Sequence, residues 1–234
     1  MKKPNQEHKI KTIARIETDF KEKFGIPRQS GIIPELSGKI IFEKKYRDVN
    51  AIRGLEKFTH LWLLWLFSEN LDNECFPTIR PPRLGGEERI GVFATRSPFR
   101  PNSIGLSSVK LDHIEISQNS GPIIYVRGAD LLDGTPIIDI KPYIPYTDSH
   151  PDASCSFAKS EWEREVKVII SPEILKQVDE TKQQSLLKIL AQDPRPAYKE
   201  DSDDIYTMRF ADYEISFVVK NKTLKVTKIE IHST

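Results

Sequence analysis

Residues 58–67 read F-T-H-L-W-L-L-W-L-F, a run in which most side chains are large and apolar. A run of this length, rich in aromatic residues, favours a central strand buried on both faces, although periodicity alone does not exclude a helix. We predict a strand. Because a lone histidine within such a run is more often structural than catalytic, we expect His60 to be a hydrogen-bonded core residue.

Further short apolar segments, broken by glycine and proline, lie on both sides of this run. They cover residues 10–16, 39–42, 90–95, 104–111, 123–127 and 137–140. Strands of this length and spacing predict a closed or strongly curved sheet, so we expect a β-barrel. The only helix indicated in this part of the chain is a short one over residues 46–55, ending at Gly54.

The composition changes between residues 148 and 160, where Ser, Ala, Asp and Pro replace bulky side chains. Such a stretch is typical of a connector between domains. Beyond it we expect a strand over 166–170, a helix capped by Ser171 that continues to residue 190, and strands over 205–210, 213–220 and 224–231. The prediction is a mainly β chain of two domains: a β-barrel over residues 1–156 and a small α+β domain over 157–234.

The overall charge carries no signature of a nucleic-acid-binding protein. The 234 residues include 35 Lys+Arg and 34 Asp+Glu, a net charge of +1, so any surface for a polyanion must be local. The best candidate is the segment 80–100, whose five arginines are opposed by only two glutamates. These arginines are Arg80, Arg83, Arg89, Arg96 and Arg100.

Cysteine and histidine usage indicates neither a disulfide framework nor a metal site. Cys75 and Cys155 are the only cysteines, and the five histidines form no ligand motif. No secretory signal and no run of eighteen apolar residues is visible, so we expect a cytoplasmic protein with reduced thiols and no membrane or metal partner.

The most distinctive loop covers residues 95–107 and reads T-R-S-P-F-R-P-N-S-I-G-L-S. Its two prolines fix their own φ angles and favour extended conformations in the residues before them, which stiffens the backbone carrying Arg96 and Arg100. The guanidinium group of arginine binds carboxylate and phosphate groups through bidentate hydrogen bonds. Residue chemistry alone leaves open a surface turn with solvated arginines.

No G-x-G-x-x-G sequence follows an expected strand, so the chain lacks the phosphate-binding turn of doubly wound nucleotide-binding sheets. Six further blocks are nevertheless distinctive. They are F-G-I-P-R-Q (24–29), I-R-G-L-E leading into F-T-H-L-W (52–62), R-P-P-R-L-G-G (80–86), L-D-G-T-P (132–136), D-I-K-P-Y (139–143) and D-P-R-P-A-Y (193–198).

Together with the loop 95–107, these blocks resemble the TsaA-like family of S-adenosylmethionine-dependent tRNA methyltransferases. The resemblance implies a β-barrel in place of a Rossmann sheet, S-adenosylmethionine as cofactor, tRNA as partner and a homodimer. It further implies N6-methylation of a threonylcarbamoyladenosine beside the anticodon, at position 37 of the tRNA.

The resemblance also implies which residues surround the cofactor. They are Pro27, Arg28, Gln29, Ser68, Glu69, Arg96, Leu106, Leu131, Leu132, Asp133 and Gly134. Ser68 and Glu69 depart from the family, which commonly has His-Gln there. If that position contacts the cofactor through backbone groups the change is harmless, whereas loss of a needed imidazole would lower the affinity.

For methyl transfer we expect positioning and solvent exclusion to matter more than strong base catalysis. Asp139 is the candidate to orient or accept the N6 proton, and Tyr143 the candidate to stack on a base. The alternative is a structural ion pair between Asp139 and Lys141, with Tyr143 in a packing role.

RNA contacts are expected from residues in or near the distinctive blocks. Arg80, Arg83, Arg100, Lys141 and Arg195 are candidates for phosphate contacts, and Tyr198 for base stacking. Two rival functions stay open from the residues alone: a non-enzymatic module that binds RNA or an adenosine metabolite, and a small-molecule methyltransferase.

Overall fold

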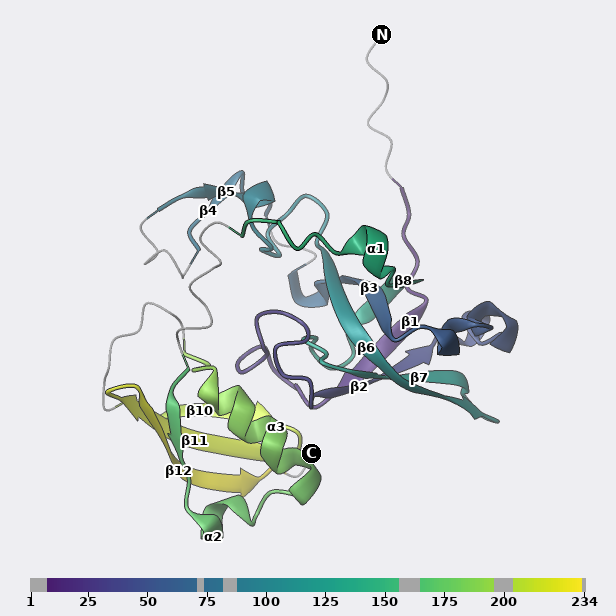
Figure 1. Ribbon diagram of the computed structural model, residues 1–234. Helices are drawn as coiled ribbons and strands as arrows, with labels where there is room; N and C mark the ends of the chain where they lie inside the picture. Colours follow the sequence, from purple (N-terminus) through teal and green to yellow (C-terminus); the bar gives the residue numbers. More distant parts are fainter. Residues whose placement is uncertain (1–7, 71–73, 82–87, 156–164, 196–203, 233–234) are drawn as a thin grey trace.

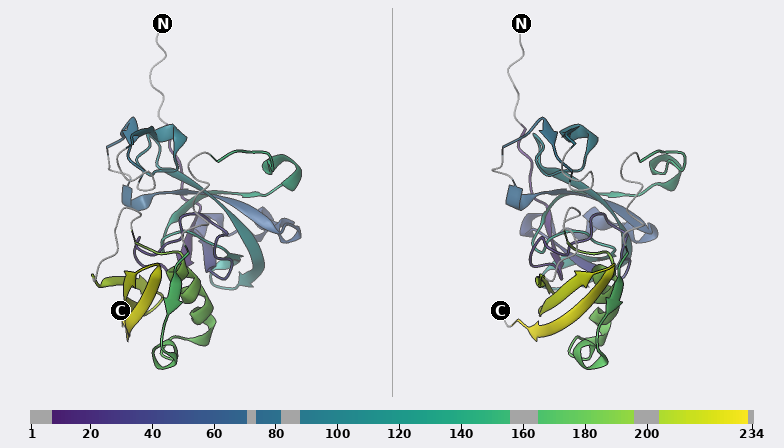
Figure 2. Two further views of the ribbon diagram at one scale, coloured as in Figure 1. Left: turned by 60° about the vertical axis from the view of Figure 1, so that its left-hand side comes forward. Right: turned by 90° about the vertical axis from the view of Figure 1, so that its left-hand side faces the viewer.

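The computed structural model describes residues 8–70, 74–81, 88–155, 165–195 and 204–232 (Figure 1). Two bodies are visible in all views, a barrel built by the first part of the chain and a smaller sheet with helices built by the last part (Figures 1 and 2). The fold class expected from the sequence, a β-barrel followed by a small α+β domain, is confirmed.

Six antiparallel strands close the barrel in the order β1-β2-β7-β6-β3-β8, with β8 pairing back onto β1. They are β1 (Ala14–Thr18), β2 (Ser37–Phe42), β3 (His60–Leu66), β6 (Ile104–Ser117), β7 (Gly121–Arg127) and β8 (Pro136–Pro142). Closure leaves no unpaired sheet edge, because each strand has a hydrogen-bonded neighbour on both sides.

Strand β3 forms where it was predicted, but the expectation that both of its faces are buried was wrong. Leu61, Leu63 and Trp65 point into the barrel and are buried, whereas the residues between them are only half-buried. A barrel has one interior, so alternate side chains of each strand must lie outside it. His60 is one of these outer residues, and its Nδ1 lies 3.0 Å from Thr59 Oγ1, so its predicted place in the core was also wrong.

Other differences concern short elements between the barrel strands. The strand expected over 90–95 is a two-residue strand, β5 (Ile90–Gly91), paired with β4 (Thr78–Ile79) and followed by a 3₁₀ turn, Val92–Ala94. The helix expected over 46–55 is instead a series of 3₁₀ turns, Lys44–Tyr46, Val49–Ile52 and Leu55–Lys57. Gly54 has φ +90°, a left-handed conformation that interrupts a helix.

The last part of the chain is an α+β unit. Its sheet has the order β10-β11-β12-β9, with β9 parallel to β12. The elements are β9 (Lys167–Ile169), α2 (Pro172–Leu175), α3 (Glu180–Ala191), β10 (Tyr206–Phe210), β11 (Tyr213–Lys220) and β12 (Thr223–Ile231).

The helix predicted over 172–190 is two helices. The first begins after Ser171, whose side chain accepts the backbone N–H of Ile174 as expected. The second begins after Asp179, whose carboxylate accepts the backbone N–H of Thr181 at 2.8 Å. This second cap starts a new helix where the sequence reading continued the old one. None of the helices in the described segments is long and apolar enough to cross a membrane.

The connection between the two bodies is not limited to the segment around residue 156, which lies outside the described residues. The β1–β2 loop (residues 19–36) packs into the α+β unit, where Phe20, Ile33 and Leu36 share a buried cluster with Met208 and Phe217. The domain boundary at residue 156 therefore stays a prediction. The hydrophobic core of the α+β unit also includes residues of the β1–β2 loop, which comes from the first part of the chain.

Candidate active site

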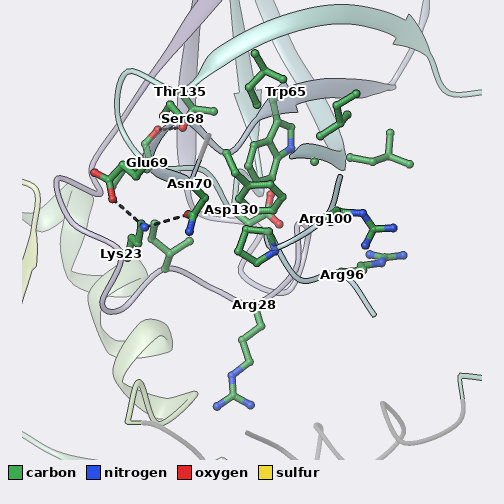
Figure 3. A pocket seen from close by; sticks show the side chains of 18 of the residues that line it. Lys23, Arg28, Trp65, Ser68, Glu69, Asn70, Arg96, Arg100, Asp130 and Thr135 are labelled. Atoms are coloured by element: carbon green, nitrogen blue, oxygen red, sulfur yellow. Dashed lines mark hydrogen bonds and ion pairs between the residues drawn. The ribbon is translucent and has the colours of Figure 1, made fainter. Parts of the chain in front are cut away.

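A cavity of about 470 Å³ lies where four loops and strand ends of the barrel meet (Figure 3). Its lining comes from the β1–β2 loop, the end of β3 with the turn Ser68–Asn70, the loop before β6, and the segment 130–135 between β7 and β8. Concave sites of this size, with apolar walls and a few polar groups, are typical of small-molecule sites.

Eight of the eleven residues predicted to surround a cofactor line this cavity. They are Pro27, Arg28, Gln29, Ser68, Glu69, Arg96, Leu106 and Leu132. Of the remaining three, Leu131 is buried in the barrel core, and Asp133 and Gly134 belong to the turn beside the cavity wall. Residues from distant parts of the sequence thus meet at one place.

The turn 132–135 is held in one conformation. Thr135 donates its backbone N–H to the Leu132 carbonyl at 3.2 Å, and Gly134 has φ +75°, which a residue with a side chain rarely adopts. The Asp133 carboxylate accepts the Thr18 N–H at 2.9 Å and pairs with Lys21 at 2.9 Å. Asp133 therefore fastens the turn to β1 and the β1–β2 loop.

A chain of hydrogen bonds leads from the barrel interior to a carboxylate at the cavity. Trp65 Nε1 donates to Ser107 Oγ at 3.0 Å, and Ser107 Oγ donates to Asp130 Oδ1 at 2.6 Å. The Trp65 ring packs against Gly105 on the neighbouring strand, where a Cβ atom would lie 2.3 Å from Trp65 Cε2. Glycine at this position allows the ring to sit where it lines the cavity.

Asp130 is the carboxylate of this site whose protonation is most altered by its surroundings. Burial raises the pKa of Asp130 to about 6, and the opposing hydrogen bond from Ser107 and positive charge of Arg96 do not cancel that effect. Sequence reasoning missed Asp130 and Trp65. The only local indication that these two residues belong to the site was their position in the sequence. Asp130 directly precedes the block 131–134, and Trp65 lies three residues before Ser68.

The two arginines of the loop 95–107 have different surroundings. Arg96 lines the cavity and donates from Nη1 to Gln29 Oε1, which joins the loop to the β1–β2 loop. Arg100 Nη1 donates to the Thr95 carbonyl at 2.7 Å, and its guanidinium lies over the Phe93 ring. Arg100 thus stabilises its own loop, although it also reaches the cavity wall.

At the mouth of the cavity, Lys23 Nζ lies 3.1 Å from Glu69 Oε2 and donates to Asn70 Oδ1 at 3.1 Å (Figure 3). In the same view the Arg28 side chain points away from the other labelled residues. Ser68 and Glu69, the pair that departs from the family pattern, therefore border the cavity, with the Glu69 carboxylate paired to the β1–β2 loop.

The predicted catalytic pair lies elsewhere. Asp139, on β8, forms an ion pair with Lys141 at 2.8 Å, and the Tyr143 ring packs 5.4 Å from Trp62 and 6.2 Å from His60 between ring centroids. None of Asp139, Lys141 and Tyr143 lines the cavity. These contacts match the alternative of an ion pair and a packing tyrosine, and the catalytic role of Asp139 stays a prediction.

A larger groove of about 1320 Å³ adjoins the cavity and shares the wall formed by Pro27, Arg28, Gln29 and Arg96. Its lining includes Arg80 and three aromatic side chains, Phe76, Phe93 and Phe99, together with residues at the end of α3. Phe93, which lies under the Arg100 guanidinium, is 75% exposed, an unusually large exposure for an aromatic side chain.

Of the four residues predicted to contact RNA that the structure describes, Arg80 and Arg100 border one of these two hollows, whereas Lys141 and Arg195 do not. Arg195 is buried, pairs with Asp193 at 2.8 Å and lies over the Tyr206 ring. Arg83 and Tyr198 lie outside the described residues. The arginines that the sequence reading placed with the cofactor, Arg28 and Arg96, line the groove as well.

Comparison with known proteins matches both parts of the chain to one family. The family model for the tRNA-methyltransferase O N-terminal domain matches residues 15–149, and that for the TrmO C-terminal domain matches residues 163–232. The tRNA (adenine(37)-N6)-methyltransferase of Escherichia coli K12 is 40% identical over 226 residues, 93% of this chain and 96% of that protein.

Two further similarities come from Pseudomonas aeruginosa. RcsF, named as an S-adenosylmethionine-dependent methyltransferase, is 38% identical over 216 residues, 89% of this chain and 91% of that protein. The crystal structure of TrmO from the same organism has a TM-score of 0.78 and 33% sequence identity, covering 97% of this chain and 98% of that one. With both family models matched in order, the chain belongs to the tRNA-methyltransferase O family.

Proposed function

We propose that this protein is a tRNA (adenine(37)-N6)-methyltransferase that uses S-adenosylmethionine and methylates an adenosine already carrying a threonylcarbamoyl group. The similarity to the Escherichia coli enzyme over nearly the whole chain supports the reaction class. The observation that carries the proposal is the cavity. Eight of the residues that the family resemblance predicted as cofactor contacts line this one cavity.

The donor set of the cavity fits this cofactor. Trp65, Leu106 and Leu132 offer apolar surface for an adenine, while Gln29 and Arg96 offer polar groups for an amino-acid moiety. Asp130 adds the carboxylate that a cationic ligand requires. When bound, S-adenosylmethionine supplies a methyl group carried on a positively charged sulfur.

The chain's own residues position the acceptor and exclude water. Arg96 and Gln29 fix one rim of the cavity through their hydrogen bond, and the rigid turn 132–135 fixes the other. Leu106 lines the cavity and is 52% exposed, so its apolar surface is open to the adenine of the cofactor. Holding the methyl donor and the acceptor base close together and aligned is the largest contribution to the rate that we expect for a displacement of this kind.

The proton released by N6 needs an acceptor, and two carboxylates are candidates. Asp139 is proposed from the sequence, whereas Asp130 is the one that lines the cavity. A carboxylate with a pKa of about 6 is largely ionised at neutral pH and accepts a proton more readily than an ordinary one. Turnover of Asp130→Asn and Asp139→Asn at saturating substrates separates the two, since only the acceptor's variant should lose activity.

The groove beside the cavity suits an anticodon loop. RNA bases splayed from a loop stack on aromatic side chains, which Phe76, Phe93 and Phe99 provide. Arg28 and Arg80 provide positive charge for phosphates, or for the carboxylate of the threonylcarbamoyl group. The shared wall of groove and cavity would bring the acceptor base next to the cofactor.

The decisive experiment compares two tRNA preparations, one carrying threonylcarbamoyladenosine and one transcribed without modification. With S-adenosylmethionine labelled in its methyl group, we expect label only in the first, as an N6-methylated threonylcarbamoyladenosine in the nucleoside digest. Label in unmodified adenosine would correct the substrate. Absence of label from both tRNA preparations would refute the proposed tRNA methyltransferase and favour a binding module or a small-molecule methyltransferase.

Two further proposals come from the resemblance and the substrate. Because tRNA is modified where it is made and used, we place the protein in the cytoplasm. We also propose a homodimer, which sedimentation equilibrium would test through a molecular mass twice the 26.9 kDa of the chain.

A further inference from the structure

The β1–β2 loop links the α+β unit to the cavity. Its inner side contributes Lys23, Pro27, Arg28 and Gln29 to the cavity lining, so its position sets the shape of the site. The strands that it joins are direct neighbours in the barrel, and a far shorter turn would suffice to connect them.

The outer side of the loop is seated in the core of the α+β unit. Phe20 is buried against Phe210, with ring centroids 5.6 Å apart, and Phe24 stacks on Phe217 at 6.5 Å. Ile33 is buried in the same cluster. These contacts anchor both ends of the loop in the α+β unit, so the loop is not held by the barrel alone.

Gly25 lies in close contact with strand β10 of the second sheet. Its φ is +93°, and a Cβ atom built there would lie 2.6 Å from Met208 Cε on β10. The loop backbone therefore rests directly on the buried Met208 side chain, one residue before the cavity-lining Ile26. A shift of β10 would be transmitted to the cavity wall through this contact.

Polar contacts fix the same interface at four further points. Ala211 donates its backbone N–H to the Asp19 carbonyl at 2.7 Å, and the Arg209 N–H donates to Glu22 Oε1 at 2.9 Å. Two ion pairs from α3 complete the set, Lys182 with Asp19 and Lys188 with Glu35. The hydrogen bond from Lys188 lowers the pKa of Glu35.

The inner side of the loop is in turn bonded to the other walls of the cavity. Lys23 contacts Glu69 and Asn70, Gln29 accepts a hydrogen bond from Arg96, and Ser30 Oγ accepts the Ser108 N–H at 3.1 Å. Of the four predicted cofactor segments outside the loop, three are therefore linked to it: 68–69, 96 and 131–134.

We propose that the α+β unit is a positioning element of the cofactor site. It holds the β1–β2 loop in its binding conformation, so the affinity for S-adenosylmethionine depends on α3 and β10, although neither is proposed to touch the cofactor. The inference rests on the proposed function. Its physical basis is preorganisation: a loop already held in place loses less freedom when the ligand binds.

The ion pair Glu35–Lys188 offers a clean test because its charges can be exchanged. In Glu35→Lys two cations face each other, and in Lys188→Glu two carboxylates do. The double variant Glu35→Lys/Lys188→Glu restores opposite charges. We expect each single change to weaken S-adenosylhomocysteine binding by about fivefold or more in calorimetric titration, and the double change to return it to within about twofold of the starting protein.

The matched control is an ion pair of the same α+β unit, within strand β12. Lys228 and Glu230 form an ion pair at 2.7 Å on β12, and Glu230→Lys should leave the affinity unchanged. Turnover gives a second readout. A displaced loop should raise the KM for S-adenosylmethionine while kcat at saturating cofactor changes little.

A purely structural role would lower the melting temperature of the single variants and leave their affinity as in the starting protein; that result overturns the inference. Should the reversed charges prevent folding, Lys188→Met removes the pair without repulsion and Lys188→Arg should rescue binding. If the unaltered protein binds neither S-adenosylmethionine nor S-adenosylhomocysteine, the proposed function fails first, and the two failures are thereby distinguished.

Discussion

The ionised carboxylate of Asp130 lowers the folding stability of the protein. Its carboxylate is buried with a pKa of about 6 in place of the ordinary 3.8, and its hydrogen-bond donors do not compensate for the lost hydration. At about 1.4 kcal/mol per tenfold change in proton affinity, holding this group ionised above pH 6 costs roughly 3 kcal/mol of folding stability. A protein retains such a group where function uses it.

The cost predicts a pH-dependent gain in stability for Asp130→Asn. At about pH 3 and below, which is under both pKa values, the carboxyl is mostly neutral in the folded and in the unfolded protein, so the variant and the starting protein should differ least in stability there. As pH rises from 4 to 6 the unfolded chain loses its proton first, so the starting protein loses stability while the variant does not. Asparagine can still accept the Ser107 hydrogen bond.

Urea unfolding at about pH 3, 5 and 8 measures this, and the variant should be more stable by up to roughly 3 kcal/mol at pH 8. Asp139→Asn is the matched control, since its carboxylate pairs with Lys141 at the surface and such pairs contribute little. Equal stability of Asp130→Asn and the starting protein at every pH would contradict the assignment.

Arg96→Ala should weaken cofactor binding without unfolding the protein. The guanidinium is exposed, so its loss leaves no cavity in the core, but it removes the link to Gln29 and a cationic group at the rim. A hydrogen bond involving a charged group corresponds to a loss of about tenfold or more in affinity. Calorimetry with S-adenosylmethionine tests this, with Arg89→Ala as control because Arg89 bonds Thr78 away from the cavity lining. An unchanged affinity removes Arg96 from the site.

At this scale the sequence identified the residues of the cavity wall by resemblance, block by block, but not the polar chain behind it. Trp65, Ser107 and Asp130 lie on three separate segments, and nothing local in any of them indicates the other two. Asp139 was proposed as the proton acceptor because its block is distinctive. The sequence also allowed an ion pair with Lys141, and the structure shows that pair on β8.

At the scale of elements, the pairing of β3 with β6 depends on the glycine at position 105, which leaves room for the Trp65 ring. Gly105→Ala would place a methyl group 2.3 Å from the Trp65 ring and displace it. Overpacking of this kind destabilises by roughly 1–3 kcal/mol, and moving the indole would also weaken its bond to Ser107.

We expect a lower melting temperature and a changed tryptophan fluorescence for Gly105→Ala. Gly91→Ala is the matched control, because nothing lies within 4 Å of a Cβ atom there and Gly91 has φ −56°. If both variants melt alike, the proposed contact between Trp65 and β6 does not constrain the strands.

The elements themselves were predictable where hydrophobic pattern decides them. Each barrel strand was anticipated, and so were β10, β11 and β12, because short apolar runs between turn residues have few other solutions. The helix predictions were wrong for two reasons: a single capping residue in one case, and tertiary contacts in the other. Asp179 starts a second helix, and the 3₁₀ turns around Gly54 depend on tertiary contacts that a window of sequence does not contain.

For the molecule as a whole, a net charge of +1 leaves no long-range attraction for tRNA. Binding must therefore rely on few charges placed close to the site, and within the described residues the groove offers Arg28, Arg80 and Arg96. For contacts to single-stranded RNA, the logarithm of the binding constant falls by about 0.7 per neutralised phosphate for each tenfold rise in salt.

The salt dependence of tRNA binding consequently reports how many of these arginines face phosphate. If all three do, they contribute a slope of about −2, and Arg80→Ala should reduce its magnitude by about 0.7 while weakening binding to all tRNA sequences alike. Filter binding between 50 and about 200 mM salt measures both. Arg89→Ala serves again as control, since Arg89 does not line the groove. An unchanged slope in Arg80→Ala would mean that the RNA follows another path over the protein, and the aromatic groove would lose its assigned ligand.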